Sequence, residues 1–507
     1  MSSRSSVIPV FIVVFLAFFL RLVLLPFAQV VDADAVTRIF MAQEWWESPA
    51  WISEGVWPPL HQYFYGLIVG LSGDHQTVPI IVTIALSSLS AIPMFHFIKR
   101  EYNEKAAFWI SLALVLSPVL FRNSYHTLSG TPFILLLLLA KNSLSKSWKE
   151  SSLRSAIWAG VFMTLACGFR YEGWMLLAVF TGFGVLQKEW KTTVIFWSVA
   201  MIFPAFWMIG NYIAHQDLFF GLSGAYDWNI VQEGVNSYLP RDVVLLRWFF
   251  FPASWLFLFS PILALVLIWG LFVIVRRKQF QWQKWRWGSI FILLLVVFVY
   301  KSNNGTLLNQ HRFTGTLIVF SLPLLAMIWE LDSRRLLQVT KFGIISLMPL
   351  SFLWGKPEYA KVFPEGSSSH YALDHFRKIS SQGMAAVPRL KNAEVDQLKD
   401  VMLSYLKNGD ALVIDFIDWE SSYYLAFESG VHQNKLLLVN GAKNAQLDIF
   451  NLRKTISSSK NGIFVVKKGS ELHELINKNA TFLSNEVKVY LLHDEPSVLI
   501  FRFEKNA

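Results

Sequence analysis

The sequence predicts a polytopic α-helical membrane protein with about eleven transmembrane helices, followed by a soluble C-terminal α/β domain. Of the 507 residues, 54% are hydrophobic and 16% are charged, whereas a soluble domain carries about 25% charged residues. Long apolar runs alternate with short clusters of Lys and Arg. After Trp354 the long apolar runs end and charged residues return.

The net charge of +10 does not indicate nucleic-acid binding. The basic residues lie mainly in short loops between apolar runs, where they set the orientation in the membrane. The single cysteine, Cys167, lies within an apolar run, so the chain has no disulfide framework and no cysteine-based metal site of its own. The first apolar run ends at Leu25-Pro26-Phe27 without a cleavage motif, so we expect a retained helix rather than a removed signal peptide.

A helix needs about 20 apolar residues to span a bilayer, and fewer where it is short or broken. The predicted spans are 7–28, 78–98, 106–121, 128–140, 157–169, 174–186, 194–213, 248–275, 290–300, 313–329 and 342–354. Lys and Arg gather after every second span, and the positive-inside rule assigns those loops to the cytoplasm. The other loops, at 29–77, 122–127, 170–173, 214–247 and 301–312, are then outside, as is everything after Trp354. The polar step at 171–172 either breaks one helix or joins two.

Composition divides the chain into a membrane domain, residues 1–354, with a large first outward loop at 29–77, and a soluble extracytoplasmic domain, residues 355–507. In the second part, 411–416, 435–439 and 462–466 are predicted as buried strands, 421–429 and 471–477 as helices, and 487–492 with 497–503 as a final hairpin. Strand and helix alternate, so we expect a small α/β domain with a largely parallel sheet.

Acidic and basic side chains collect in the loops that are predicted to face outside. The first loop carries Asp32, Asp34, Arg38, Glu44, Glu54 and His61; the others carry Arg122, His126, Arg170, Glu172, Lys301, His311 and Arg312. Carboxylates at the mouth of a membrane helix are costly unless something uses them. A phosphate leaving group needs cationic or metal stabilisation, and an attacking hydroxyl needs a carboxylate as general base. This set therefore suits a reaction on a lipid-linked anionic substrate.

Short motifs in these loops resemble the GT-C superfamily of polyprenyl-phosphate-sugar-dependent membrane glycosyltransferases. They are the acidic pair followed by Trp57-Pro58-Pro59-Leu60-His61, the step Gly168-Phe169-Arg170-Tyr171-Glu172-Gly173, and His311-Arg312-Phe313 followed by Leu322-Pro323-Leu324. Within the superfamily the chain is most similar to the protein mannosyltransferase and lipid A aminoarabinose transferase branch. One departure is Ser129-Gly130-Thr131-Pro132, where many relatives carry an acidic step. No cofactor is firmly expected, and the lack of that carboxylate leaves a divalent metal open.

The resemblance implies an inverting transferase that moves a hexosyl or pentosyl group from a polyprenyl-phosphate donor to a hydroxyl of a lipid, glycan or protein acceptor. It also implies a bacterial inner-membrane protein in contact with membrane lipids, with its catalytic loops outside. The base would be Asp34, whose spacing to Ala42 matches the aminoarabinose transferase pattern, or Asp32, whose spacing to Arg38 matches the oligosaccharyltransferase pattern. Arg170, Lys301, His311 and Arg312 would hold the donor phosphate. Arg38, Glu54, Trp57, His61, Tyr63, Arg122, His126 and Glu172 would contact the substrate.

Structural alternatives stay open for several of these residues. Asp32 can cap a helix that begins near Ala33, with Asp34 in its first turn. Arg170 and Glu172 can form a local ion pair, and His61 can serve as a structural hydrogen bonder. At the level of the whole chain, a flippase of lipid-linked sugars would carry charges near the midplane, often in repeated halves. A non-catalytic envelope scaffold would not need the loop acids.

Overall fold

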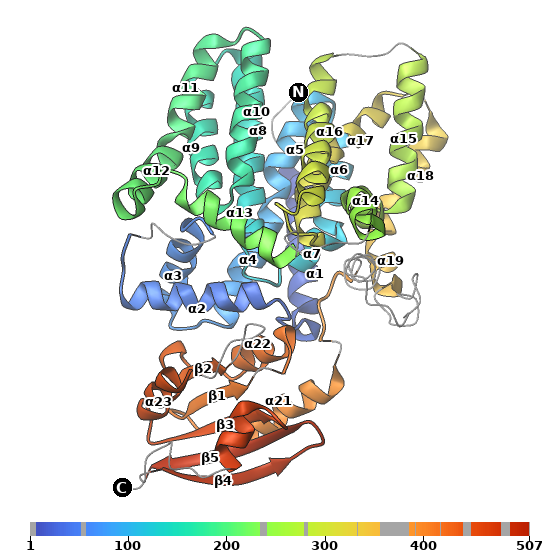
Figure 1. The fold of residues 1–507 in the computed structure, drawn as a ribbon. Helices are drawn as coiled ribbons and strands as arrows, with labels where there is room; N and C mark the ends of the chain where they lie inside the picture. Colours follow the sequence, from blue (N-terminus) through green and yellow to red (C-terminus); the bar gives the residue numbers. More distant parts are fainter. Residues whose placement is uncertain are drawn as a thin grey trace. The chain divides into compact units, whose positions relative to one another are not determined.

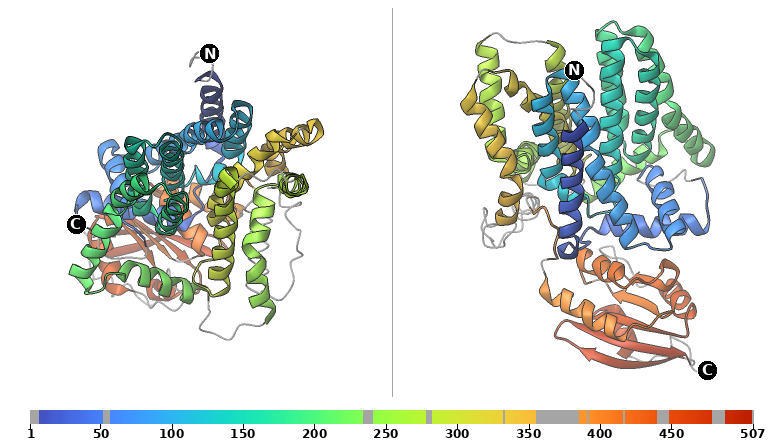
Figure 2. Two further views of the ribbon diagram at one scale, coloured as in Figure 1. Left: turned by 90° about the horizontal axis from the view of Figure 1, so that it is seen from above. Right: turned by 180° about the vertical axis from the view of Figure 1, so that it is seen from behind.

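The computed structural model describes residues 7–51, 57–233, 241–277, 282–331, 333–354, 385–390, 392–415, 417–439, 448–477 and 487–505. These residues fold as two compact units, one from the described parts of 1–26, 51–61 and 81–387, the other from the described parts of 27–50, 62–80 and 388–507. Figure 1 and Figure 2 show the elements of each unit. The boundary predicted after residue 354 stays a prediction, because residues 355–384 lie outside the described residues.

The first unit is built almost entirely from apolar helices. They are α1 (Val7–Leu24), α4 (Thr77–Leu89), α5 (Ala91–Glu101), α6 (Glu104–Leu116), α7 (Pro118–Asn123), α8 (Gly130–Glu150), α9 (Leu153–Phe169), α10 (Glu172–Leu186), α11 (Trp190–Ala200), α12 (Ile202–His215), α13 (Phe220–Glu233), α14 (Arg241–Leu258), α15 (Pro261–Arg276), α16 (Trp282–Asn303), α17 (Thr314–Ala326), α18 (Arg334–Ile345) and α19 (Leu347–Trp354), with the short 3-10 turns η3 (His311–Phe313) and η4 (Met327–Glu330). In Figure 1, α8, α9, α10 and α11 run side by side, and α9 contacts each of the other three. The polar step at 171–172 therefore joins two helices rather than bending one.

Among the described residues, five helices are long and apolar enough to cross a membrane: Ile8–Phe27, Thr77–Glu101, Trp190–His215, Lys284–Asn303 and His311–Glu330. A sixth span results if the pair Arg247–Leu258 and Pro261–Arg276 counts as one, although it is bent by 101°. At that bend Ser260 has a φ of 84°, and Pro261 lacks the N–H that would continue the helix. The chain is thus an integral membrane protein, and the predicted count of eleven spans is not confirmed.

The second unit contains a five-stranded sheet with the order β2-β1-β3-β5-β4. Its strands are β1 (Ala411–Asp415), β2 (Leu436–Val439), β3 (Asn461–Lys467), β4 (Val487–Asp494) and β5 (Val498–Lys505). β1 pairs in parallel with β2 and β3, whereas β5 pairs antiparallel with β3 and β4. The strands lie where the sequence predicts them, but the sheet is mixed, because the final hairpin adds two antiparallel strands to three parallel ones.

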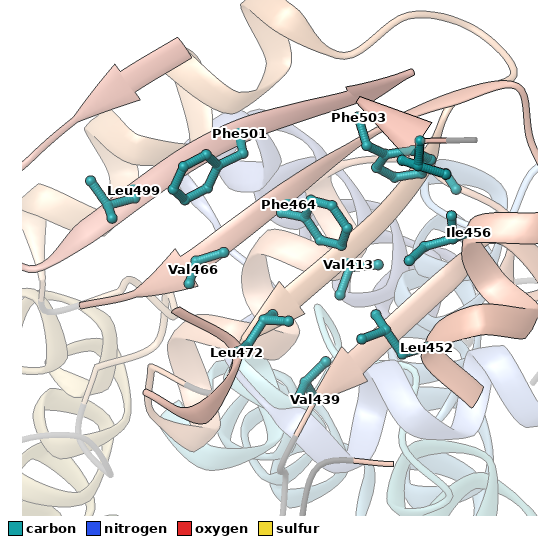
Figure 3. Close-up of a cluster of buried hydrophobic side chains, with 12 residues drawn as sticks. Val413, Val439, Leu452, Ile456, Phe464, Val466, Leu472, Leu499, Phe501 and Phe503 are labelled. Carbon is teal, nitrogen blue, oxygen red and sulfur yellow. The ribbon is translucent and has the colours of Figure 1, made fainter. Parts of the chain in front are cut away.

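Helices cover this sheet. On one face, α23 (Ile449–Ser457) and α24 (Glu471–Asn477) cover a core that includes Val413, Phe464 and Phe501 (Figure 3). Leu412 and Ile414 point to the opposite face and are also fully buried. α22 (Trp419–Glu428) contacts β1 and β2, and α21 (Ala393–Tyr405) contacts α22. The C-terminal part is therefore an α/β fold with its own hydrophobic core.

The segment predicted from the sequence as the first outward loop, residues 29–77, contains the helices α2 (Ala33–Glu47) and α3 (Leu60–Ser72), most of which belong to this second unit. α2 packs on α22 of the C-terminal part. The ring of Trp46 lies over Gly70 of α3, where an added Cβ would come within 1.9 Å of it. Only glycine permits this close approach of α3 to α2.

Candidate active site

Basic side chains from separate segments of the first unit gather around Phe313. The Cζ atoms of Arg170 and Arg312 lie 5.0 and 5.6 Å from the centre of its ring. η3, which carries His311 and Arg312, also contacts α7, which carries Arg122. The structure thus brings residues of three outward-facing loops predicted from the sequence to one place.

His126 lies in the electrostatic reach of two of these arginines. Its side chain is 2% exposed. Burial lowers the pKa of His126 well below its ordinary value, and the charges of Arg122 and Arg312 lower it further. Its Nδ1 atom is buried without a hydrogen-bond partner in the described part of the chain. At neutral pH the imidazole is therefore neutral, and the positive charge here comes from the arginines.

Arg170 and Glu172 form an ion pair in the turn between α9 and α10. The Nε atom of Arg170 donates to both carboxylate oxygens of Glu172, at 3.1 Å each, and its Nη2 also donates to Oε1. Burial alone would raise the pKa of Glu172, but the nearby Arg170 and, more weakly, Lys301 hold it below its ordinary value. The ion pair anticipated as an alternative is present, and it offsets the charge of Arg170.

His61 is a structural hydrogen bonder in this arrangement. Its side chain is fully buried, and its Nε2 lies 2.7 Å from the carbonyl oxygen of Thr127. Thr127 follows His126 directly. His61 therefore fixes the segment that carries the neutral histidine.

Arg21, in the last turn of α1, supports the same segment, and the sequence analysis did not identify it. Its guanidinium is fully buried and donates to Ser124 Oγ at 3.1 Å, Val115 O at 2.9 Å and Ala17 O at 3.0 Å. The hydroxyl of Tyr125 in turn donates to the carbonyl oxygen of Arg21, at 3.1 Å. These bonds join α1 to the end of α6 and to Ser124 and Tyr125, the two residues between α7 and His126. The sequence does contain a sign of this role, because Arg21 lies inside an apolar run. Placing a charged side chain there is costly unless the protein uses it.

The acidic pair lies in the second unit, at the start of α2. Asp32 is the N-cap, with its Oδ1 accepting from the backbone N–H of Ala35 at 3.2 Å. The capping alternative is therefore observed for Asp32. Asp34 lies in the first turn, where a carboxylate suits the helix dipole. Arg38 follows one turn later with only 7% exposure.

The remaining predicted residues are divided between the units. Tyr63 belongs to the second unit, where its ring lies 5.0 Å from that of Trp45. Trp57 is half-buried in the first unit, and Lys301 is exposed in the last turn of α16. Glu54 lies outside the described residues. The structure thus gathers the predicted phosphate-binding residues in one unit and holds the two acids in the other.

The donor atoms of the described residues do not fit a bound divalent metal. No group of three or more His, Cys, Asp or Glu side chains in the described ranges lies close enough to hold one ion. The loop Ser129–Pro132 offers no carboxylate, and Glu172 is taken by Arg170.

Comparisons with known proteins bear on the fold of the chain. Residues 56–210 match the family model of dolichyl-phosphate-mannose-protein mannosyltransferases. The structure is similar to that of ArnT from Cupriavidus metallidurans bound to undecaprenyl phosphate, with a TM-score of 0.65 and 13% identity over 99% of this chain and 98% of that one. The apo state of the same protein gives a TM-score of 0.60 at 13% identity, with the same coverage. A comparison with curated protein sequences found no match. The resemblance inferred from the short motifs is confirmed: the chain is a membrane protein with the fold of the GT-C glycosyltransferases.

Proposed function

We propose that the chain is an inverting glycosyltransferase that moves a sugar from a polyprenyl-phosphate donor to an acceptor hydroxyl, on the outer face of a bacterial inner membrane. The observation that carries this proposal is the cationic cluster, defined as Arg122, Arg170, Lys301, His311 and Arg312, which the first unit assembles from distant segments. The similarity in fold to ArnT bound to undecaprenyl phosphate supports the donor class. The acceptor class is a lipid, a glycan or a protein.

Within the cationic cluster, Arg122 and Arg312 are proposed to bind the donor phosphate, because the charges of both reach the buried His126 between their segments. Arg170 pairs with Glu172, which offsets part of its charge. A guanidinium can hold two phosphate oxygens through parallel hydrogen bonds. His126, neutral and buried beside these arginines, offers a hydrogen-bonding nitrogen without adding charge.

Asp34 is the proposed general base. Its spacing to Ala42 matches the aminoarabinose transferase pattern, and it lies in the first turn of α2, two residues after the capping residue Asp32. Asp34 takes the proton of the acceptor hydroxyl as the acceptor oxygen attacks the anomeric carbon. The bond from that carbon to the phosphate oxygen breaks, and its electron pair leaves with the polyprenyl phosphate. Attack from the side opposite the leaving group inverts the anomeric configuration.

The cations lower the barrier because negative charge grows on the phosphate as the bond breaks. Preorganised donors aimed at developing charge are commonly the largest contribution to such catalysis. Arg21 and His61 hold the segment with Arg122 and His126 in place from two sides. The remaining predicted contacts, by Arg38, Glu54, Trp57 and Tyr63, stay predictions of substrate binding.

Purified full-length protein, incubated with a panel of polyprenyl-phosphate sugars and a bacterial membrane extract as acceptor source, tests this function. We expect release of free polyprenyl phosphate from at least one donor, and the Asp34→Asn variant serves as the control. A flippase would move the intact donor across vesicles without cleaving it, and a scaffold would do neither. Leaflet exchange of intact donors without cleavage of any of them would contradict the proposal.

A further inference from the structure

Gln29, which lies between α1 and α2, is hydrogen-bonded to the C-terminal part of the second unit through both its backbone and its side chain. Its backbone N–H donates to Pro388 O at 2.9 Å, and its side-chain Oε1 accepts from the backbone N–H of Leu390 at 2.6 Å. Its Nε2 donates to Asp396 Oδ1 at 3.1 Å and to the hydroxyl oxygen of Tyr424 at 3.2 Å. An amide side chain offers both donors and an acceptor, and here both kinds are used.

The partners of Gln29 are themselves held in place. Asp396 accepts from the hydroxyl of Tyr424 at 2.7 Å and from Lys399 Nζ at 3.0 Å. The hydrogen bond from Tyr424 is the main reason that the pKa of Asp396 lies below its ordinary value. Tyr424 is 1% exposed. Gln29 is therefore bound to an acceptor that is 44% exposed but is held in place by Tyr424 and Lys399.

The other end of α2 is held by the same C-terminal part. His432 Nε2 lies 3.0 Å from Glu47 Oε1, and Gln433 Nε2 lies 3.5 Å from Glu44 Oε2. Between the ends, α2 packs on α22. The strong contacts of Gln29, however, occur at the end that carries the acids, only three residues before Asp32.

We propose that Gln29 is a positioning residue through which the C-terminal domain fixes the N-terminus of α2 and thereby the orientation of Asp34. Val30 and Val31, which link Gln29 to Asp32, are both buried, at 6% and 7% exposure. Their packing restricts the movement of Asp32 relative to Gln29. The effect on turnover rests on the proposed function, whereas the docking of α2 does not. A base displaced by about 1 Å can lower a rate about a hundredfold. The α/β domain thus contributes to the reaction without supplying a reacting group.

Hydrogen exchange and kinetics of full-length Gln29→Ala test this role together. We expect the amides in the first turns of α2 to exchange about tenfold faster or more, with strand β1 as protected as before. In turnover, kcat should fall by about tenfold to a hundredfold, while KM for the donor stays within about twofold, because no residue of the cationic cluster has changed. Gln433→Ala, which removes only the 3.5 Å contact at the far end, is the matched control and should change neither quantity.

A rescue pair separates this contact from general damage. Gln29→Glu sets a carboxylate against that of Asp396, so it should behave like Gln29→Ala or worse. Adding Asp396→Asn restores a donor opposite the new acceptor, so the double variant should regain α2 protection and kcat to within about threefold of Asp396→Asn alone. Unchanged exchange in Gln29→Ala, or unchanged kcat despite faster exchange, would overturn the proposal, and so would a double variant that is no better than Gln29→Glu. Absence of turnover in the unmodified protein would count against the proposed function alone, because exchange measures the docking without substrate.

Discussion

Glu172 holds Arg170 at two points, with Arg170 Nε at 3.1 Å from each oxygen of the carboxylate. The two side chains are only 17% and 15% exposed. Arg170 also lies over the ring of Phe313, and the guanidinium of Arg312 lies near the same ring. The ion pair therefore fixes the position of Arg170 in the cationic cluster and lowers the net charge of the cluster.

Replacing Glu172 with Gln should destabilise the protein by roughly 3 kcal/mol at pH 7, since it leaves a largely buried guanidinium without its counter-ion. The folded pKa of Glu172 lies below its unfolded value, so the pair stabilises the fold above the unfolded pKa, about 4.3. That contribution is lost as pH falls through the folded pKa. Thermal melts of both proteins at several pH values measure the difference.

Glu150→Gln is the matched control, because Glu150 and Lys146 form an exposed pair at 3.9 Å. Such pairs contribute about 0–1 kcal/mol, so this variant should melt almost as the unmodified protein does. Equal melting of Glu172→Gln and Glu150→Gln at pH 7 would show that the buried pair does not stabilise the fold. If the difference in melting temperature between Glu172→Gln and the unmodified protein did not become smaller at acidic pH, the ion pair would not be its cause.

Arg312→Ala should weaken binding of undecaprenyl phosphate by about tenfold to a hundredfold, the usual cost of losing a hydrogen bond to a charged group. Arg312→Lys keeps the charge but not the two-point geometry, so its affinity should be intermediate. Titration of the purified variants with the lipid phosphate gives the values. Arg154→Ala removes an exposed arginine in the first turn of α9 and should bind normally. Equal affinity of the Arg312 and Arg154 variants would remove Arg312 from the phosphate site.

Arg21→Met keeps the length and the apolar stem but removes the guanidinium. The carbonyl of Val115 and the hydroxyl of Ser124 then lose a buried donor, so the melting temperature should fall by several degrees. Binding of undecaprenyl phosphate should also weaken, because the segment with Arg122 and His126 loses its support. Tyr125→Phe removes one bond of the same set and should show a smaller loss in both measurements. A variant that melts earlier but binds normally would mean that Arg21 serves the fold alone.

Much of the C-terminal fold could be predicted from the sequence. Its strands are short apolar runs flanked by polar turns, and β1 and α24 lie within a residue of their predicted bounds. The prediction missed α21, although Val395, Leu398 and Met402 recur at helical spacing on its buried face. The many charged residues between them obscured that pattern. The antiparallel half of the sheet depends on long-range pairing, which local alternation does not encode.

The site could be predicted only as a set of loops on one face of the membrane. The positive-inside pattern placed Arg122 and Arg312 on the same side, but not beside the same histidine. The bond from Gln29 to Asp396 joins residues 367 positions apart, and neither residue type signals it locally. Spacing left both Asp32 and Asp34 open as the base, and the cap observed at Asp32 is the contact that the sequence offered as the alternative.

The central claim is that Asp34 takes the acceptor proton, and single-turnover release of polyprenyl phosphate at saturating donor measures this most directly. Asp34→Asn keeps the shape of the side chain but removes the base, so the rate should fall by about a hundredfold to ten-thousandfold while donor binding is retained. Asp32→Asn should release product at nearly the normal rate, because Asn caps a helix about as well as Asp does. A near-normal rate in Asp34→Asn, or a larger loss in Asp32→Asn than in Asp34→Asn, would contradict the account.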